Sequence, residues 1–287
     1  MPAGADRPSA EDRSSHQRPT DVVPATVRAL LTGLVDYAGL FPPAALSMAE
    51  VVENYASYLA SPDAWMLGRL VIPASRLAEC HAERSEESAC WRVSALLANL
   101  AEAPMLSAKY HGLDIDSCEL KASTVAEINA AADVIDPGIA TFVEIPVTED
   151  PALLLDAIAK QRLNAKIRTG GVTPDAFPAA DHVARFLLGC HERDIAFKAT
   201  AGLHHPMRGT YRLTYAADAP TGVMYGFLNV SAAASAARRG ARIEDVEDTL
   251  TQVDHAPIDN WARGFFLSFG SCSFREPVDD LERIGVL

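Results

Sequence analysis

The sequence lacks several features that would define its class directly. No apolar run approaches the roughly 18 to 20 residues needed to cross a membrane, and residues 1–22 contain no apolar stretch like that of a secretory signal. The five cysteines are odd in number and scattered, without the close pairs of a zinc site or the density of a disulfide scaffold. We therefore expect a cytoplasmic protein with free thiols and no membrane partner.

Positive charge is also scarce. Lysine and arginine total 25 against 38 aspartates and glutamates, which gives a net charge of −13. Such an acidic protein repels a phosphate backbone, so we expect no nucleic-acid partner. No Gly-x-Gly-x-x-Gly motif follows an apolar run, which disfavours a nicotinamide-binding fold, and we expect no cofactor.

The sequence does contain enough apolar residues for a large core, 49% of 287. Residues 1–22 are rich in Pro, Ser, Asp and Arg and are expected to form a disordered tail. From residue 23 onward, short apolar runs alternate with stretches of helical period, a pattern typical of parallel βα units. These runs predict eight strands, at residues 33–36, 68–73, 92–98, 117–122, 140–146, 164–169, 196–201 and 265–271.

Eight strands with intervening helices predict an α/β fold, a (β/α)8 TIM barrel in a single domain over residues 23–287. Its active site would lie at the carboxyl ends of the strands. A helical insertion at about 206–262 separates the last two strands; it opens with a Gly- and Pro-bearing loop at 206–221 and is a candidate lid. Helices are expected at 48–60, 124–134, 151–161, 175–193, 222–238 and 243–253.

Four neighbouring strands carry charges inside otherwise apolar runs. Side chains alternate across a strand, and both faces of a barrel strand are ordinarily apolar. Charges on the outer face would lie under helices, so we expect these to point inward near the upper end of the barrel. The runs are CELKA (118–122), TFVEI (141–145), AKIRT (165–169) and FKATA (197–201), which place Glu119 with Lys121, Glu144 with Phe142, Lys166 with Arg168, and Lys198 with Thr200 on common faces.

This charged cluster has two interpretations. It has a local excess of two positive charges, which favours an anionic substrate, but a structural ion-pair network that plugs the barrel is the alternative. A desolvated lysine crowded by cations loses proton affinity and can attack a carbonyl to form a Schiff base, with a carboxylate or a second lysine transferring protons. The charges counted are Lys121, Lys166, Arg168 and Lys198 against Glu119 and Glu144.

The segments AKIRTGG (165–171), FKATAGLHH (197–205) and FGSCSF (269–274) resemble the sixth, seventh and eighth strands of the deoxyribose-phosphate aldolase family of class I aldolases. The resemblance implies that Lys166, in a Lys-x-x-Thr-Gly strand with Thr169 and Gly170, is the Schiff-base residue. It implies that Lys198 is the electrostatic partner of Lys166. It also implies that substrate phosphate binds backbone groups of Ala201, Gly202, Gly270 and Ser271.

The chain departs from that family at three places. Lys121 stands where the family carries an acidic proton shuttle on the fourth strand, which leaves Glu119 or Glu144 for that role. Arg168 replaces a serine, and two histidines follow the seventh strand, so we expect a different substrate. The residues expected to bind it include Arg168, Thr200, His204 and His205. The predicted function is a Schiff-base-forming aldolase or lyase that acts on a small anionic carbonyl compound, phosphorylated or not.

Further ligand contacts are expected from turns at the barrel mouth. Gly170 and Gly171 can bring backbone N–H groups to an oxyanion, although a plain loop explains them as well. Asp36 opens the segment DYAGLFPPA (36–44), at the end of the first strand, and is expected to line the mouth.

Two other functions stay open at this point. One is a metal-dependent hydrolase or isomerase. The other is a barrel that binds small anions without catalysis, which the presence of Lys121 in place of an acid favours. The formation of a homo-oligomer is also left open. The metal-dependent alternative would use His204, His205 and Glu144.

Overall fold

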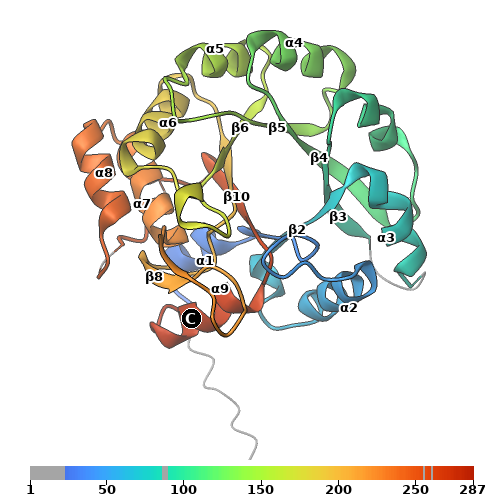
Figure 1. Ribbon diagram of the computed structural model, residues 1–287, viewed down its shortest axis with the longest axis horizontal. Helices are drawn as coiled ribbons and strands as arrows, with labels where there is room; N and C mark the ends of the chain where they lie inside the picture. The colour runs from blue at the N-terminus through green and yellow to red at the C-terminus, as the bar shows by residue number, and fades with distance from the viewer. Residues whose placement is uncertain (1–22, 86–89, 255, 260) are drawn as a thin grey trace, which may run out of the picture.

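The computed structural model describes residues 23–85, 90–254, 256–259 and 261–287, and the tail expected at 1–22 lies outside the described residues. Eight parallel strands close into a barrel in the order β1-β10-β7-β6-β5-β4-β3-β2, with helices around it (Figure 1). The predicted (β/α)8 TIM barrel is confirmed. Its strands are β1 (Val35–Tyr37), β2 (Leu67–Pro73), β3 (Trp91–Leu96), β4 (Leu113–Lys121), β5 (Ala140–Glu144), β6 (Asn164–Arg168), β7 (Phe197–Thr200) and β10 (Phe266–Ser271).

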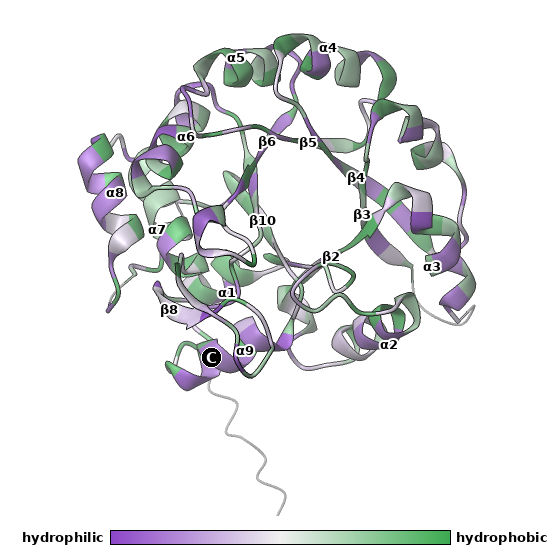
Figure 2. Ribbon diagram, in the orientation of Figure 1, coloured by the Kyte–Doolittle hydropathy of each residue, from purple (hydrophilic) through white to green (hydrophobic). Residues whose placement is uncertain are grey.

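The helices outside the barrel carry both hydrophobic and hydrophilic residues, as expected for amphipathic helices (Figure 2). Capping boxes at Ser47 and Thr124 begin α2 and α4. Three short helices, α1, α3 and α9, are not among those predicted. No helix in the described ranges is long and apolar enough to cross a membrane. The helices are α1 (Ala25–Leu31), α2 (Met48–Leu59), α3 (Leu77–Glu83), α4 (Val125–Val134), α5 (Ala152–Lys160), α6 (Ala180–Glu192), α7 (Phe227–Arg238), α8 (Ile243–Thr251) and α9 (Arg275–Arg283).

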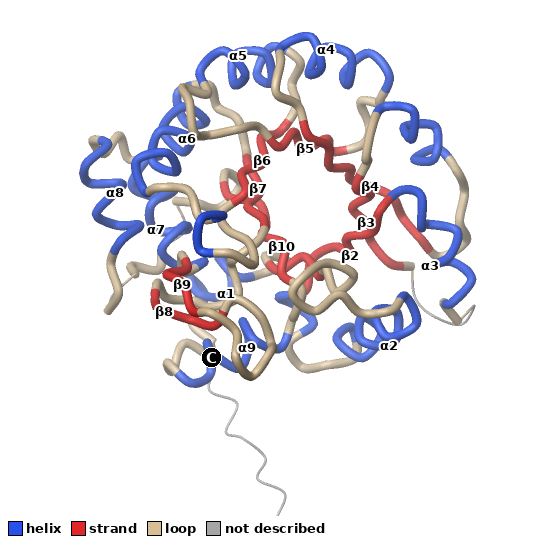
Figure 3. Tube along the Cα trace, viewed as in Figure 1, coloured by secondary structure: helices blue, strands red, loops and turns tan. Residues whose placement is uncertain are grey.

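The insertion between β7 and β10 differs from the prediction. The expected loop at 206–221 contains the first strand of an antiparallel hairpin, β8 (Gly209–Arg212) with β9 (Thr221–Met224), which lies outside the barrel ring (Figure 3). The helix expected from residue 222 begins only at Phe227, because the preceding residues pair as β9. The helix expected at 175–193 is also shorter, because Pro178 cannot donate a backbone hydrogen bond and the residue before it avoids helical geometry.

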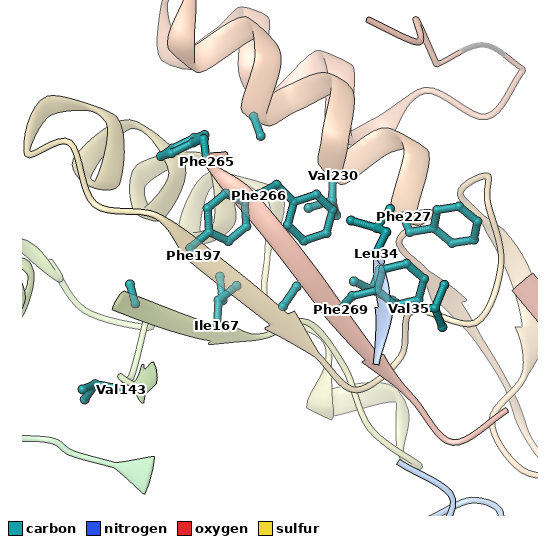
Figure 4. Close-up of a cluster of buried hydrophobic side chains, with 14 of the residues drawn as sticks. Leu34, Val35, Val143, Ile167, Phe197, Phe227, Val230, Phe265, Phe266 and Phe269 are labelled. Atoms are coloured by element: carbon teal, nitrogen blue, oxygen red, sulfur yellow. The ribbon is translucent and has the colours of Figure 1, made fainter. Parts of the chain in front are cut away.

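A cluster of buried apolar side chains, including Phe197, Phe265 and Phe266, lies between the barrel wall and the insertion helices (Figure 4). Phe197 on β7 is fully buried, and its ring centroid lies 5.7 Å from that of Phe186, 5.1 Å from that of Phe265 and 5.0 Å from that of Phe266. Because side chains alternate along β7, the outward position of Phe197 directs its neighbour Lys198 into the barrel. Packing on the outside therefore fixes the orientation of a charged residue on the inside.

Replacing Phe197 by Ala should lower the free energy of unfolding by about 3–5 kcal/mol, because the substitution leaves a cavity among three aromatic rings. Urea unfolding followed by circular dichroism measures the change. The matched control is Leu153→Ala on α5, where the side chain is 74% exposed and a change within about 0.5 kcal/mol is expected. Equal effects of the two substitutions would contradict this account of the core.

Candidate active site

The barrel interior brings together charged side chains from five strands. The strand register places Glu144 on β5, Lys166 on β6, Lys198 on β7 and Ser268 on β10 side by side. Glu119 on β4 is paired with Phe142, two residues before Glu144. Since inward positions alternate along each strand, these residues project into one interior.

The interior charges form one chain of alternating sign. The Lys198 Nζ lies 2.5 Å from an Asp36 oxygen and 2.5 Å from Glu119 Oε1. The other oxygen of Glu119 lies 2.8 Å from the Lys166 Nζ, which in turn lies 2.9 Å from Glu144. All five residues are at most 9% exposed. Glu119 therefore connects the two lysines, and Glu144 extends the chain toward the barrel mouth.

Burial of these charges costs several kcal/mol for each ion unless partners compensate. Burial alone would raise the pKa of the Glu119 carboxyl, but Lys166 and Lys198 outweigh it and hold this pKa well below its usual range. Burial would lower the pKa of Lys198, yet Asp36 and Glu119 keep it above the ordinary value. Glu119 and Lys198 are therefore both charged at neutral pH.

Neutral donors complete the inner end of the chain. Ser94 donates to Glu119 at 2.8 Å, and Ser268 donates to Asp36 at 2.7 Å. The backbone N–H of Arg69 donates to the other oxygen of Asp36 at 2.6 Å. These hydrogen bonds occupy the carboxylate lone pairs that the lysines leave open.

The outer end of the chain meets two more cations at the mouth. Lys121 and Arg168 lie 3.6 Å and 3.9 Å from Glu144, with side chains 72% and 50% exposed. Burial would raise the pKa of the Glu144 carboxyl, but Lys166, Arg168 and Lys121 together lower it. Lys121 is thus a mouth residue, and Glu119 is the carboxylate of β4 that contacts both buried lysines.

The expectation that cations crowd one another around a lysine is wrong. Each buried lysine lies between two carboxylates, Lys166 between Glu119 and Glu144, and Lys198 between Asp36 and Glu119. The expectation failed because it left Asp36 out of the cluster and placed all the cations at one depth. Carboxylates within hydrogen-bonding distance of an ammonium can instead act as acceptors for its proton.

A cavity of about 330 Å³ lies directly beside this chain. Its size suits a small molecule. Segments that the charge pattern does not mark complete its wall, including Phe41 to Pro43 from DYAGLFPPA and Arg212 to Tyr215 from the hairpin. The predicted site residues that line it are Glu119, Lys121, Glu144, Lys166, Arg168, Gly171, Lys198, Thr200, Ala201, Gly202, His204, His205 and Gly270.

Four residues predicted to bind substrate lie outside this lining. Asp36 is buried beneath it as the partner of Lys198. The Thr169 hydroxyl donates to the Ala201 carbonyl at 2.8 Å and so fixes the turn after β7. A side chain on Gly170 would collide with the Phe177 ring. The Ser271 hydroxyl accepts the backbone N–H of Ser273 at 3.3 Å.

The turn after β7 has an unusual backbone. Ala201 and Gly202 both have left-handed conformations, with φ of 63° and 74°. This geometry is strained for an alanine, and such strain is concentrated at functional sites. The turn directs the chain toward His204 and His205 at the cavity wall.

The two histidines pair with carboxylates of α9. His204 Nδ1 lies 3.0 Å from Glu276, and His205 Nδ1 lies 2.5 Å from Asp280. Within the described ranges, no group of three or more His, Cys, Asp or Glu side chains has the geometry of a metal site, so the structure does not assemble the predicted metal-ligand set of His204, His205 and Glu144.

Comparison with models of protein families and with curated proteins gives no match for this chain. Function must therefore be inferred from the chemistry of the cavity.

Replacing Glu119 by Gln should lower the free energy of unfolding at pH 7 by about 1.5–3 kcal/mol, because two buried ammonium groups lose a shared charged acceptor while Lys166 keeps Glu144 and Lys198 keeps Asp36. Folding lowers the pKa of Glu119 below its ordinary value of about 4.5. The associated stabilisation is therefore present above that pH and is lost as the pH falls toward the folded-state pKa.

Urea unfolding between pH 7 and pH 3 should accordingly show a weaker acid dependence for E119Q than for the unsubstituted protein. Glu53→Gln, at an exposed position of α2, is the control and should leave the profile unchanged. An E119Q profile parallel to that of the unsubstituted protein would show that the Glu119 charge does not stabilise the barrel.

Proposed function

We propose that the protein is a Schiff-base-forming aldolase or lyase that acts on a small anionic carbonyl compound. The position of Lys166 carries this proposal. Its amine lies in the wall of a cavity of about 330 Å³, 2.8 Å from Glu119 and 2.9 Å from Glu144. An amine beside two proton acceptors and an open space for a carbonyl compound has the components needed for imine formation.

The first step is loss of a proton from the Lys166 ammonium. Glu144, which lies at the solvent-facing end of the ion-pair chain, passes this proton on to solvent and does not keep it, because its pKa is lowered. The neutral amine attacks the substrate carbonyl carbon, and the resulting carbinolamine loses water to give an iminium ion. Lys198 keeps its proton, since Asp36 and Glu119 raise its pKa. Its fixed positive charge holds Glu119 in place and stabilises negative charge that develops nearby.

The iminium ion then accepts electrons. Cleavage of the bond between the α and β carbons of the substrate sends its electron pair to the iminium nitrogen and produces an enamine. Protonation of the enamine and hydrolysis release the second product and regenerate Lys166. Glu144 is placed to return the proton, because it lies between Lys166 and the cations of the mouth.

The charge distribution at the mouth supports an anionic substrate. Lys121 and Arg168 are exposed there and lie 3.6 Å or more from their carboxylate partner. Arg212 of β8 also lines the cavity and is exposed. Three cations around the entrance of an otherwise acidic protein attract a carboxylate or a phosphate.

Borohydride reduction in the presence of a carbonyl probe should attach the probe covalently at Lys166. Pyruvate, dihydroxyacetone phosphate and acetaldehyde are suitable probes, and peptide mass spectrometry locates the adduct. Lys166→Met should abolish the adduct, whereas Lys160→Met, at the end of α5, should not. An adduct on another lysine, or none with any of the three probes, would overturn the proposal.

Arg168→Gln should weaken the binding of an anionic substrate and leave the binding of a neutral analogue unchanged. The expected loss is roughly tenfold in KM, since a hydrogen bond to a charged group contributes about 1.5–3 kcal/mol and Arg168 is half exposed. Steady-state kinetics with paired anionic and neutral carbonyl compounds measure the difference. An equal loss for both compounds would rule out a role in recognising the anion.

A further inference from the structure

A second hydrogen-bonded group lines the same cavity and has no direct bond to the lysine chain. His204 Nδ1 lies 3.0 Å from Glu276 Oε2, and the Tyr215 hydroxyl donates to that same oxygen at 2.9 Å. All three residues line the cavity. They come from the turn after β7, from α9 and from the loop of the β8–β9 hairpin.

These hydrogen bonds determine which nitrogen of His204 carries hydrogen. Burial alone would raise the pKa of Glu276, but hydrogen bonding to His204 and the other polar contacts lower it, so this carboxylate is ionised and can only accept. The bond to Glu276 therefore requires hydrogen on Nδ1. In the neutral ring, Nε2 is then left with its lone pair.

The Nε2 atom belongs to a residue that lines the cavity. Within the described part of the protein Nε2 has no hydrogen-bond partner. It is also not one of the fully buried polar atoms that lack a partner, so it is accessible. The opposite side of the ring, Nδ1, is hydrogen-bonded to Glu276, and Glu276 in turn accepts a hydrogen bond from Tyr215. A carboxylate that fixes the tautomer of an imidazole is the arrangement by which proteins prepare a general base.

We propose that His204 is the general acid–base that acts on the hydroxyl of the substrate, separately from the ion pairs of Lys166 and Lys198. This proposal rests on the Schiff-base function proposed above. In cleavage, Nε2 takes the proton of the β-hydroxyl while the bond between the α and β carbons breaks. The hydroxyl carbon becomes an aldehyde or ketone, and the electron pair goes to the iminium on Lys166. In condensation, the imidazolium returns the proton to the new alkoxide.

This assignment defines the substrate class further. The substrate is a β-hydroxy carbonyl compound with an anionic group. Its carbonyl carbon reaches Lys166, its hydroxyl reaches His204, and its anion lies among the cations of the mouth. Glu276 and Tyr215 act through His204 and are positioning residues.

The test separates two reactions that share the imine. Exchange of the methyl protons of pyruvate for deuterium requires Lys166 and enamine formation but no hydroxyl proton transfer. Cleavage of 4-hydroxy-2-oxopentanoate to pyruvate and acetaldehyde requires both. His204→Gln should therefore retain borohydride trapping and deuterium exchange within a few-fold but lose cleavage by about 100-fold or more.

The control is His191→Gln on α6, whose ring packs against Phe265 outside the barrel. It should leave all three measurements unchanged. Equal losses of exchange and cleavage in H204Q, or no loss of cleavage, would overturn the role of His204. Absence of trapping and exchange in the unsubstituted protein would instead overturn the Schiff-base function.

A measurement that needs no substrate tests the positioning. Nitrogen-15 NMR of the histidines should show His204 with hydrogen on Nδ1, and Glu276→Gln should weaken this preference. In the substrate assays, the same substitution should slow cleavage by roughly tenfold while deuterium exchange persists. His204 with hydrogen on Nε2 in the unsubstituted protein would overturn the proposal, and this result would stand even if H204Q failed to fold.

Discussion

The pairing of two buried ammonium groups with three buried carboxylates is the interaction on which the interior of this barrel depends. Asp36, Lys198, Glu119, Lys166 and Glu144 alternate in sign from the inner end to the mouth. Removal of any one charge takes an ion-pair partner from a buried neighbour, which costs more than loss of an exposed pair. The barrel brings these charges together because β1, β4, β5, β6 and β7 each direct one of the five side chains into the same interior.

The same series of ion pairs places Lys166 and Glu144 at the edge of a cavity. Lys166 is the lysine closer to the mouth, since its partner Glu144 also contacts the exposed Lys121 and Arg168, whereas Lys198 is enclosed by Asp36 and Glu119. One lysine can therefore meet a ligand while the other remains a fixed charge. The ion pairs form a structural network, and in the function proposed above the same groups carry protons, so the two interpretations of the sequence pattern are compatible.

The insertion after β7 and helix α9 contribute another part of the cavity wall. The hairpin brings Tyr215 to Glu276 of α9, and the left-handed turn at Ala201 and Gly202 brings His204 to the same carboxylate. No charge pattern marks these residues, because Tyr215 and Glu276 lie in short polar segments that resemble ordinary surface. The helix α7 behind them is buried almost throughout, between β10, α6 and α8.

Sequence alone determined the barrel, because eight short apolar runs alternate with stretches of helical period. It also indicated Glu119, Glu144, Lys166 and Lys198 as inward charges, because helices cover the outer face of each barrel strand and a charge there would be buried without a partner. It also marked His204 through its place after β7. Only the tertiary structure decided that Asp36 completes the chain, that Lys121 stays at the mouth, and that Glu276 orients His204. The contacts of Asp36 with Lys198 and of Glu276 with His204 join residues 162 and 72 positions apart, and a local sequence pattern contains no information on which distant residues meet.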